Sequence, residues 1–292
     1  MKYRIRHTTR YRYPEQVSQC HSLTHLLPRD TATQRCVESH IEVQPMPVLG
    51  NTRVDYFGNH CYHFTVQWPH ILLDVTAHSM VEVEDFRPSL GLDFGITCAQ
   101  ARAALRQSSE LATLEAREYL LESPLVRLGP ELADYARPSF GDERPLLSAV
   151  RELVDRIYSE FTYDPVSTTV STPVMEVLGH RRGVCQDFAH LAIACLRSLG
   201  FPARYVSGYL ETLPAPGTQK LIGADASHAW FAVYSPVEGW MDFDPTNNTL
   251  AAQQHITTAW GRDYADVTPL KGTVFGGGRS HSVEVEVDVE RC

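Results

Sequence analysis

The chain has 292 residues, of which 43% are hydrophobic and 21% are charged, values close to those of an average globular protein. This composition excludes disordered and fibrous classes, and the length exceeds the roughly 100–200 residues of a typical domain. Acidic residues outnumber basic residues by 35 to 26, which gives a net charge of −9. No nucleic-acid partner is therefore expected, because binding phosphates requires a basic surface.

Residues 1–97 are predicted to form a β-rich domain. Short segments rich in Val, Tyr and Phe show alternating apolar residues, and proline and glycine turn signals separate them. The predicted strands span residues 2–13, 37–43, 60–68 and 80–86. An antiparallel sheet or sandwich fits this pattern.

Residues 98–292 mix helical and extended patterns, which predicts an α+β domain. Helix-forming residues dominate 98–122, and apolar residues recur every three or four positions in 145–161 and in 185–199. Strands are expected at 203–210, 228–234, 240–244 and, in a strictly alternating tail, 282–290. We expect this tail strand, with its acidic outer face, to belong to the second domain.

The seven cysteines form neither a complete disulfide set nor a closely spaced zinc pair, because their number is odd and no C-x-x-C is present. No targeting peptide is expected, and the apolar runs are shorter than the roughly 20 residues that cross a bilayer. We therefore predict a cytoplasmic protein with reduced thiols and no membrane contact. At least one cysteine calls for another explanation.

Cys185 is predicted to open the third helix, directly after Gly183 and Val184. The unpaired N–H groups and the positive end of the helix dipole stabilise a thiolate at such a position. The same N–H groups can hold an oxyanion. The alternative is a small buried apolar residue, which is the interpretation we give to Cys195 further along the helix.

A nucleophilic cysteine needs a base and a group that orients the base. His228 and Asp244 lie on two strands that a hairpin connects. A turn centred on Val237 or on Pro236 places both side chains on one face, whereas a centre between two residues separates them. Their proximity is therefore permitted by the pattern and not fixed by it.

Two other residues compete for these roles. Asp242 shares the face of Asp244, which we prefer because Pro245 ends the strand there and leaves the carboxylate at its mouth. His190 is a weaker candidate base than His228, because it lies on the same helix as Cys185.

Four segments around these residues resemble the transglutaminase-like superfamily. They are Gly183-Val-Cys-Gln-Asp-Phe-Ala-His, Gly200-Phe-Pro-Ala-Arg-Tyr-Val-Ser-Gly-Tyr, Ser227-His-Ala-Trp and Gly239-Trp-Met-Asp-Phe-Asp-Pro-Thr-Asn. Their form is similar to the bacterial branch, whose members are often described as candidate cysteine proteases. Residues 7–13, 27–29 and 55–59 also resemble the β-rich N-terminal domain of this branch, and 261–269 resembles its C-terminal segment.

The resemblance implies a sandwich-like β domain over 1–97 and a papain-like transglutaminase core over 98–292. It implies that Cys185 is the nucleophile, His228 the base and Asp244 the residue that orients the base, with no metal or organic cofactor. Animal transglutaminases carry tryptophan directly after the nucleophile, where this chain has Gln186, and the acidic loops of their calcium sites are not recognisable. Crosslinking and calcium dependence are therefore not expected.

Other clusters have weaker interpretations. His60 and His63 face opposite ways on an alternating strand, so they do not form a metal site with Cys61, and Cys20, His21 and His25 form none either. Arg181 and Arg182 are expected either to stabilise the thiolate or substrate, or to be solvated. Asp187 is expected to favour the helix start. Trp230 and Trp240 are expected in the sheet core.

The function we predict is cysteine-dependent acyl transfer on amide or peptide bonds through a thioester, with hydrolysis by water preferred. A protein-glutamine transglutaminase or another amine acyltransferase is the first alternative, since the same three residues serve both. The second is a non-catalytic binding module on the same fold. The expected partner is a peptide or amide-bearing substrate, and neither the oligomeric state nor the purpose of the N-terminal domain is predicted.

Overall fold

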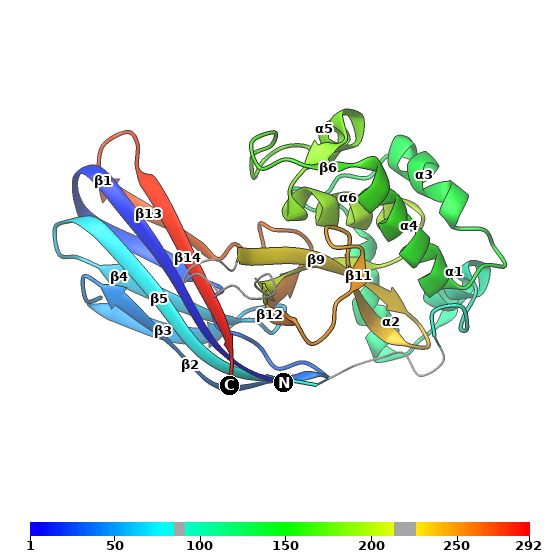
Figure 1. The fold of residues 1–292 in the computed structure, drawn as a ribbon, viewed down its shortest axis with the longest axis horizontal. Helices are drawn as coiled ribbons and strands as arrows, with labels where there is room; N and C mark the ends of the chain where they lie inside the picture. Colours follow the sequence, from blue (N-terminus) through cyan, green and yellow to red (C-terminus); the bar gives the residue numbers. More distant parts are fainter. Residues whose placement is uncertain (85–90, 213–225) are drawn as a thin grey trace, which may run out of the picture.

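The computed structural model describes residues 1–84, 91–212 and 226–292. The first sheet contains β1 (Lys2–Thr24), β2 (Gln34–Gln44), β3 (Leu49–Val54), β4 (His60–Val66), β5 (His70–Val83), β13 (Leu270–Gly276) and β14 (Ser282–Arg291). The second contains β8 (Ala203–Leu210), β9 (Ala226–Ser235), β10 (Gly239–Asp244), β11 (Thr249–Leu250) and β12 (His255–Gly261). The helices lie beside the second sheet, away from the first (Figure 1).

The helical segments precede or flank the second sheet. They are α1 (Cys98–Gln107), α2 (Leu111–Ala116), η1 (Arg117–Leu120), α3 (Pro130–Ala136), η2 (Arg137–Ser139), α4 (Leu146–Glu160), α5 (Val174–His180) and α6 (Cys185–Ser198). A short parallel pair, β6 (Thr162–Tyr163) and β7 (Arg182–Gly183), leads into α6. Among the described residues, no helix has the length and apolar character that a membrane crossing requires.

The long strand β1 organises the N-terminal sheet because it changes neighbours along its length. Its first half lies between β5 and β14, and its second half lies between β4 and β13. Apolar side chains from β1, β2, β4 and β5 meet in one core between these halves. The predicted antiparallel, sandwich-like domain and the α+β class are thereby confirmed.

The tail forms the predicted alternating strand, but β14 pairs with β1 in the N-terminal sheet and not with the second sheet. Val287 and Val289 are its buried residues, and its carboxylates lie on the other face. Alternation shows that a strand has two different faces, but it does not identify the neighbouring strand. The domain boundary at residue 97 stays a prediction.

Several predicted elements have different bounds in the structure, among them the strand expected at 2–13, which extends to Thr24 as β1. The helix expected over 98–122 is broken after α1, because the Ser108 hydroxyl accepts the N–H of Glu110 at 3.1 Å and stabilises an extended turn. The strand expected at 80–86 is the end of β5, which begins at His70, and residues 85–86 lie outside the described residues. The helices expected at 145–161 and 185–199 are confirmed as α4 and α6.

The helix α6 is the centre of the second core. It packs against β8 and β9 on one side and against α3, α4 and α5 on others, so eleven of its residues are buried. The second sheet has the order β11-β10-β9-β8-β12, with antiparallel pairing throughout. This arrangement fixes the start of α6 relative to β9 and β10.

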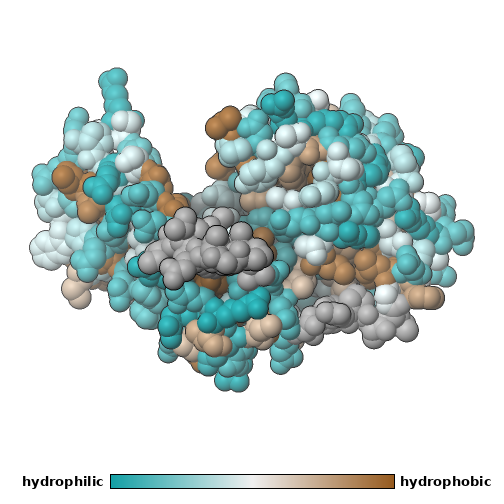
Figure 2. All heavy atoms as spheres, viewed as in Figure 1, coloured by the Kyte–Doolittle hydropathy of each residue, from teal (hydrophilic) through white to brown (hydrophobic). Residues whose placement is uncertain are grey.

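Two amide side chains of the N-terminal domain hydrogen-bond to the backbone of β12. Asn59 donates to the carbonyl of Trp260 at 2.8 Å and accepts its N–H at 2.9 Å. Gln34 forms the same pair of bonds with Thr257, both at 2.8 Å. Each side-chain amide therefore forms with β12 the two hydrogen bonds that a residue of a neighbouring strand would form. The two domains appear as separate lobes with a notch between them on the face drawn in Figure 2.

Replacing Gln34 by alanine should lower the free energy of unfolding by about 1–3 kcal/mol, because the buried N–H and C=O of Thr257 lose their partners. Urea unfolding of the full chain measures this change. Gln67→Ala, at an exposed glutamine, is the control. Equal effects of the two substitutions would show that the hydrogen bonds between Gln34 and Thr257 do not stabilise the contact between the two domains.

Candidate active site

Cys185 is the first residue of α6, and its side chain is half-buried. The side chain of Asp187 accepts the N–H of Val184 at 2.8 Å and the hydroxyl of Thr168 at 2.6 Å, which caps the helix. A Cβ at Gly183 would lie 2.8 Å from the Cβ of Asp187, so this position needs glycine. The local sequence therefore holds the sulfur at the open N-terminal end of a rigid helix.

The hairpin of β9 and β10 brings His228 and Asp244 together. Gly239 pairs with Ser235, so the turn is centred on Val237, one of the two registers that the sequence permits. The Nε2 of His228 lies 2.7 Å from Oδ2 of Asp244. This contact leaves Nδ1 as the ring nitrogen available to face the thiol.

The ionisation of these groups follows from burial and hydrogen bonding. Burial disfavours a charged ring, but hydrogen bonds with Asp244 and with Cys185 outweigh it and raise the pKa of His228 to about 10. Burial likewise opposes the charge of Asp244, yet hydrogen bonds from His228 and His255 hold its pKa well below the usual range. An imidazolium and a carboxylate therefore coexist at neutral pH.

The carboxylate of Asp244 is fully buried and accepts five hydrogen bonds. Its Oδ2 accepts from His228, from His255 at 3.0 Å and from the Asn247 side chain at 2.7 Å. Its Oδ1 accepts the backbone N–H groups of Thr246 and Asn247. The carboxylate is thus fixed in position from three sides.

His255 is the residue of this cluster that the sequence did not indicate. The N–H of Ala252 donates to its Nδ1 at 3.2 Å, so its proton is on Nε2 and points to Asp244. Its ring packs edge-on against Trp230 with centroids 5.1 Å apart. No local signal marks His255, because it reaches the site through the pairing of β12 with β8. Asn247 ends the segment 239–247 that resembles the superfamily, and the resemblance implies no role for it.

The competing candidates have other partners. Asp242 accepts the indole N–H of Trp230 at 2.9 Å and lies near Arg204. His190 is buried, which lowers its pKa to about 4, and its Nε2 accepts the N–H of Tyr264 at 3.1 Å. The structure therefore brings neither of them to the thiol–imidazole pair.

The two arginines before Cys185 form ion pairs at the surface. Arg181 contacts Glu160, and Arg182 lies 3.3 Å from Asp164. Exposed pairs of this kind contribute little to stability. Of the two expectations for these residues, the structure agrees with solvated loop charges.

A cavity of about 1130 Å³ lies between the N-terminal domain and the second sheet. Trp230, Trp240, Trp260 and His255 are among its lining residues, and Trp230 is fully buried as expected. Among the described residues, neither Cys185 nor its two partners line it. Of the described residues that hydrogen-bond to Asp244, only His255 therefore lines the cavity.

The chain is similar along its whole length to uncharacterized mycobacterial proteins. It is 42% identical to one from Mycobacterium tuberculosis, covering 99% of this chain and 92% of that protein. It is 32% identical to one from Mycobacterium leprae, covering 99% and 98%. A protein-glutamine gamma-glutamyltransferase of Pseudomonas aeruginosa is 31% identical over 117 residues, which cover 39% of this chain and 17% of that protein.

A crystal structure of a candidate cysteine protease from Cytophaga hutchinsonii shares the fold. Its TM-score is 0.76 at 22% identity, covering 99% of this chain and 90% of that one. The family model of the bacterial transglutaminase-like N-terminal region matches residues 3–82, and that of the transglutaminase-like superfamily matches residues 133–245. The second match contains Cys185, His228 and Asp244, and it ends before His255. The chain belongs to the bacterial branch of the transglutaminase-like superfamily.

Proposed function

We propose that this protein is a cysteine-dependent acyl-transfer enzyme that hydrolyses amide or peptide bonds through a thioester. The observation that carries the proposal is the position of the His228 ring, which interacts with the Cys185 thiol and lies 2.7 Å from the buried Asp244 carboxylate. A nucleophile, a base and an orienting group in contact are the arrangement that covalent acyl transfer needs.

The reaction begins with a proton shared between Cys185 and His228, which gives a thiolate and an imidazolium. The thiolate attacks the substrate carbonyl, and the backbone N–H of Cys185 at the helix start stabilises the oxyanion. His228 then donates its proton to the leaving amine, and the C–N bond breaks. Water, deprotonated by the now neutral His228, attacks the thioester and releases the acid and the thiolate.

Asp244 keeps the Nε2 proton of His228 directed toward itself, so that Nδ1 exchanges the reactive proton with sulfur. His255 and Asn247 act as positioning residues, because they hold the carboxylate without contacting the reacting atoms. Their N–H groups also compensate the charge of a carboxylate that has no contact with water.

Amine transfer is the second candidate function. The aligned segment of the P. aeruginosa gamma-glutamyltransferase favours it, and the same three residues support it. Hydrolysis is preferred because water suffices to resolve the thioester, whereas transfer requires a second substrate. A non-catalytic module is disfavoured, since all three residues are present and in contact. A reducing, cytoplasmic setting is consistent with seven free thiols.

Replacing Cys185 by alanine should lower amide turnover by on the order of 10³-fold or more, because no thioester can form. The measurement is a panel of peptide and γ-glutamyl amides, with and without an amine, read by product mass. Cys36→Ala removes another half-buried thiol and serves as the control. Turnover in Cys185→Ala equal to that of the control would refute the mechanism, and exclusively amine-linked products would select the transferase.

Replacing Asp244 by asparagine should lower the pKa of His228 from about 10 toward its ordinary value, because Asp244 is the group that raises it most. The imidazolium is lost as the pH rises through this pKa, so the alkaline limb of the rate profile moves to lower pH. An NMR titration of the His228 ring reports the same shift. Asp242→Asn should leave both unchanged, and a shift in this control instead would identify Asp242 as the orienting residue.

Replacing His255 by alanine should lower kcat roughly 10-fold or more with little change in KM, because Asp244 loses a hydrogen bond to a charged acceptor. The alkaline limb of the pH–rate profile should also move. His255→Gln, which retains an N–H donor, should partly restore both kcat and the position of this limb. An unchanged pH profile in His255→Ala would show that this residue has only a packing role.

A further inference from the structure

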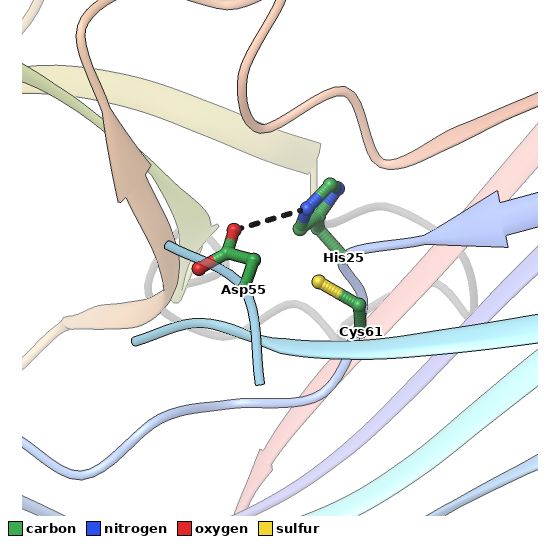
Figure 3. Close-up of side chains that lie close together, drawn as sticks. All are labelled: His25, Asp55 and Cys61. Carbon is green, nitrogen blue, oxygen red and sulfur yellow. Dashed lines mark ion pairs between the residues drawn. The ribbon is translucent and has the colours of Figure 1, made fainter. Parts of the chain in front are cut away.

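Three side chains that can bind a metal converge in the N-terminal domain (Figure 3). His25 directly follows β1, Asp55 directly follows β3, and Cys61 lies in β4. Their ligand atoms all lie within 4.8 Å of one another, and the residues His25 and Cys61 are only 3% and 2% exposed. The cluster lies outside the active site and has no part in its chemistry.

The separation of His25 and Asp55 differs from that of the other histidine–aspartate pairs around Asp244. Nε2 of His25 lies 3.5 Å from Oδ2 of Asp55, whereas the two rings that donate to Asp244 lie at 2.7 and 3.0 Å. Two ligands at about 2.0–2.1 Å from one tetrahedral zinc ion are roughly 3.3–3.5 Å apart. The distance therefore fits two ligands of a common ion better than a direct hydrogen bond.

The surroundings hold the ligand atoms in place. Nδ1 of His25 donates to the carbonyl of Thr268 at 3.0 Å, which directs the lone pair of Nε2 toward Asp55 and Cys61. Oδ1 of Asp55 accepts the N–H groups of Phe57 and Asn59, and Oδ2 accepts the Asn59 side chain at 2.8 Å. Such outer contacts are typical of metal ligands.

The thiol of Cys61 donates to the carbonyl of Asn59 at 3.6 Å, so metal binding replaces this contact and requires the thiol to lose its proton. A bound divalent ion would stabilise the thiolate, and the thiol proton would pass to solvent as the sulfur–metal bond forms.

We infer that His25, Asp55 and Cys61 bind a zinc ion at the joint between the two domains. Nitrogen, carboxylate oxygen and thiolate sulfur form a donor set that suits zinc, and a water molecule completes the four ligands. His60 and His63, the neighbours of Cys61 in sequence, do not belong to the cluster. The ion would fix the β3–β4 hairpin, whose Asn59 bonds to β12, and thus stabilise the domain joint.

The test uses the full chain carrying Cys185→Ala, so that the active-site thiol cannot bind metal. After removal of metal by a chelator, the protein is titrated with Co²⁺, whose visible spectrum reports thiolate ligation, and Zn²⁺ is then added in competition. The expected result is one equivalent per chain, with a sulfur-to-cobalt band that zinc abolishes. Zinc should also raise the melting temperature.

Matched variants assign the ligands. Cys61→Ser should abolish the sulfur-to-cobalt band, and both Cys61→Ser and His25→Gln should weaken zinc binding by more than about 100-fold. His63→Gln and Cys36→Ser should bind zinc and cobalt as tightly as the parent protein, the full chain that carries only Cys185→Ala. Absence of the band in the parent, or its survival in Cys61→Ser, would overturn the inference. Because the parent measurement requires no substitution in the cluster, misfolding of one variant leaves the test decisive.

Discussion

A carboxylate without access to water must find all its hydrogen-bond donors within the protein, and the architecture around Asp244 meets this requirement. Its donors come from β9, from the turn after β10 and from the start of β12. The order of these strands in the sheet, with β12 beyond β8, is what allows a histidine on β12 to share an acceptor with a histidine on β9. The position of the His228 ring depends on this one buried charge.

The N-terminal domain contributes to the same arrangement indirectly. Gln34 and Asn59 satisfy backbone groups on the edge of β12 that no strand of the described residues covers, and β12 carries His255. The domain thus supports the strand from which a positioning residue reaches the carboxylate. This link gives the N-terminal domain a physical role in the site, although none of its side chains contacts the thiol–imidazole pair among the described residues.

The sequence predicts those features of the fold that depend on residues close together in the chain. The start of α6 at Cys185 follows from Gly183 and the capping residue Asp187. The sequence permits two registers for the hairpin of β9 and β10, and the register centred on Val237 occurs. The resemblance to a known family supplied the domain order and the three site residues. The sequence does not indicate His255, the strand that pairs with β14 or the break at Ser108. The first two depend on contacts between distant segments, and the third depends on a side chain competing for a backbone N–H.

The pairing of β14 with β1 makes the helices and the second sheet an insertion between β5 and the last two strands. The two chain ends lie side by side, and the N–H of Cys292 donates to the carbonyl of Lys2 at 2.9 Å (Figure 1). One edge of β1 therefore remains unpaired until β13 and β14, which follow the second sheet in the sequence, are available. The helices and the second sheet can fold before β13 and β14 complete the first sheet, so β1 precedes them in sequence but gains all its neighbours only after them.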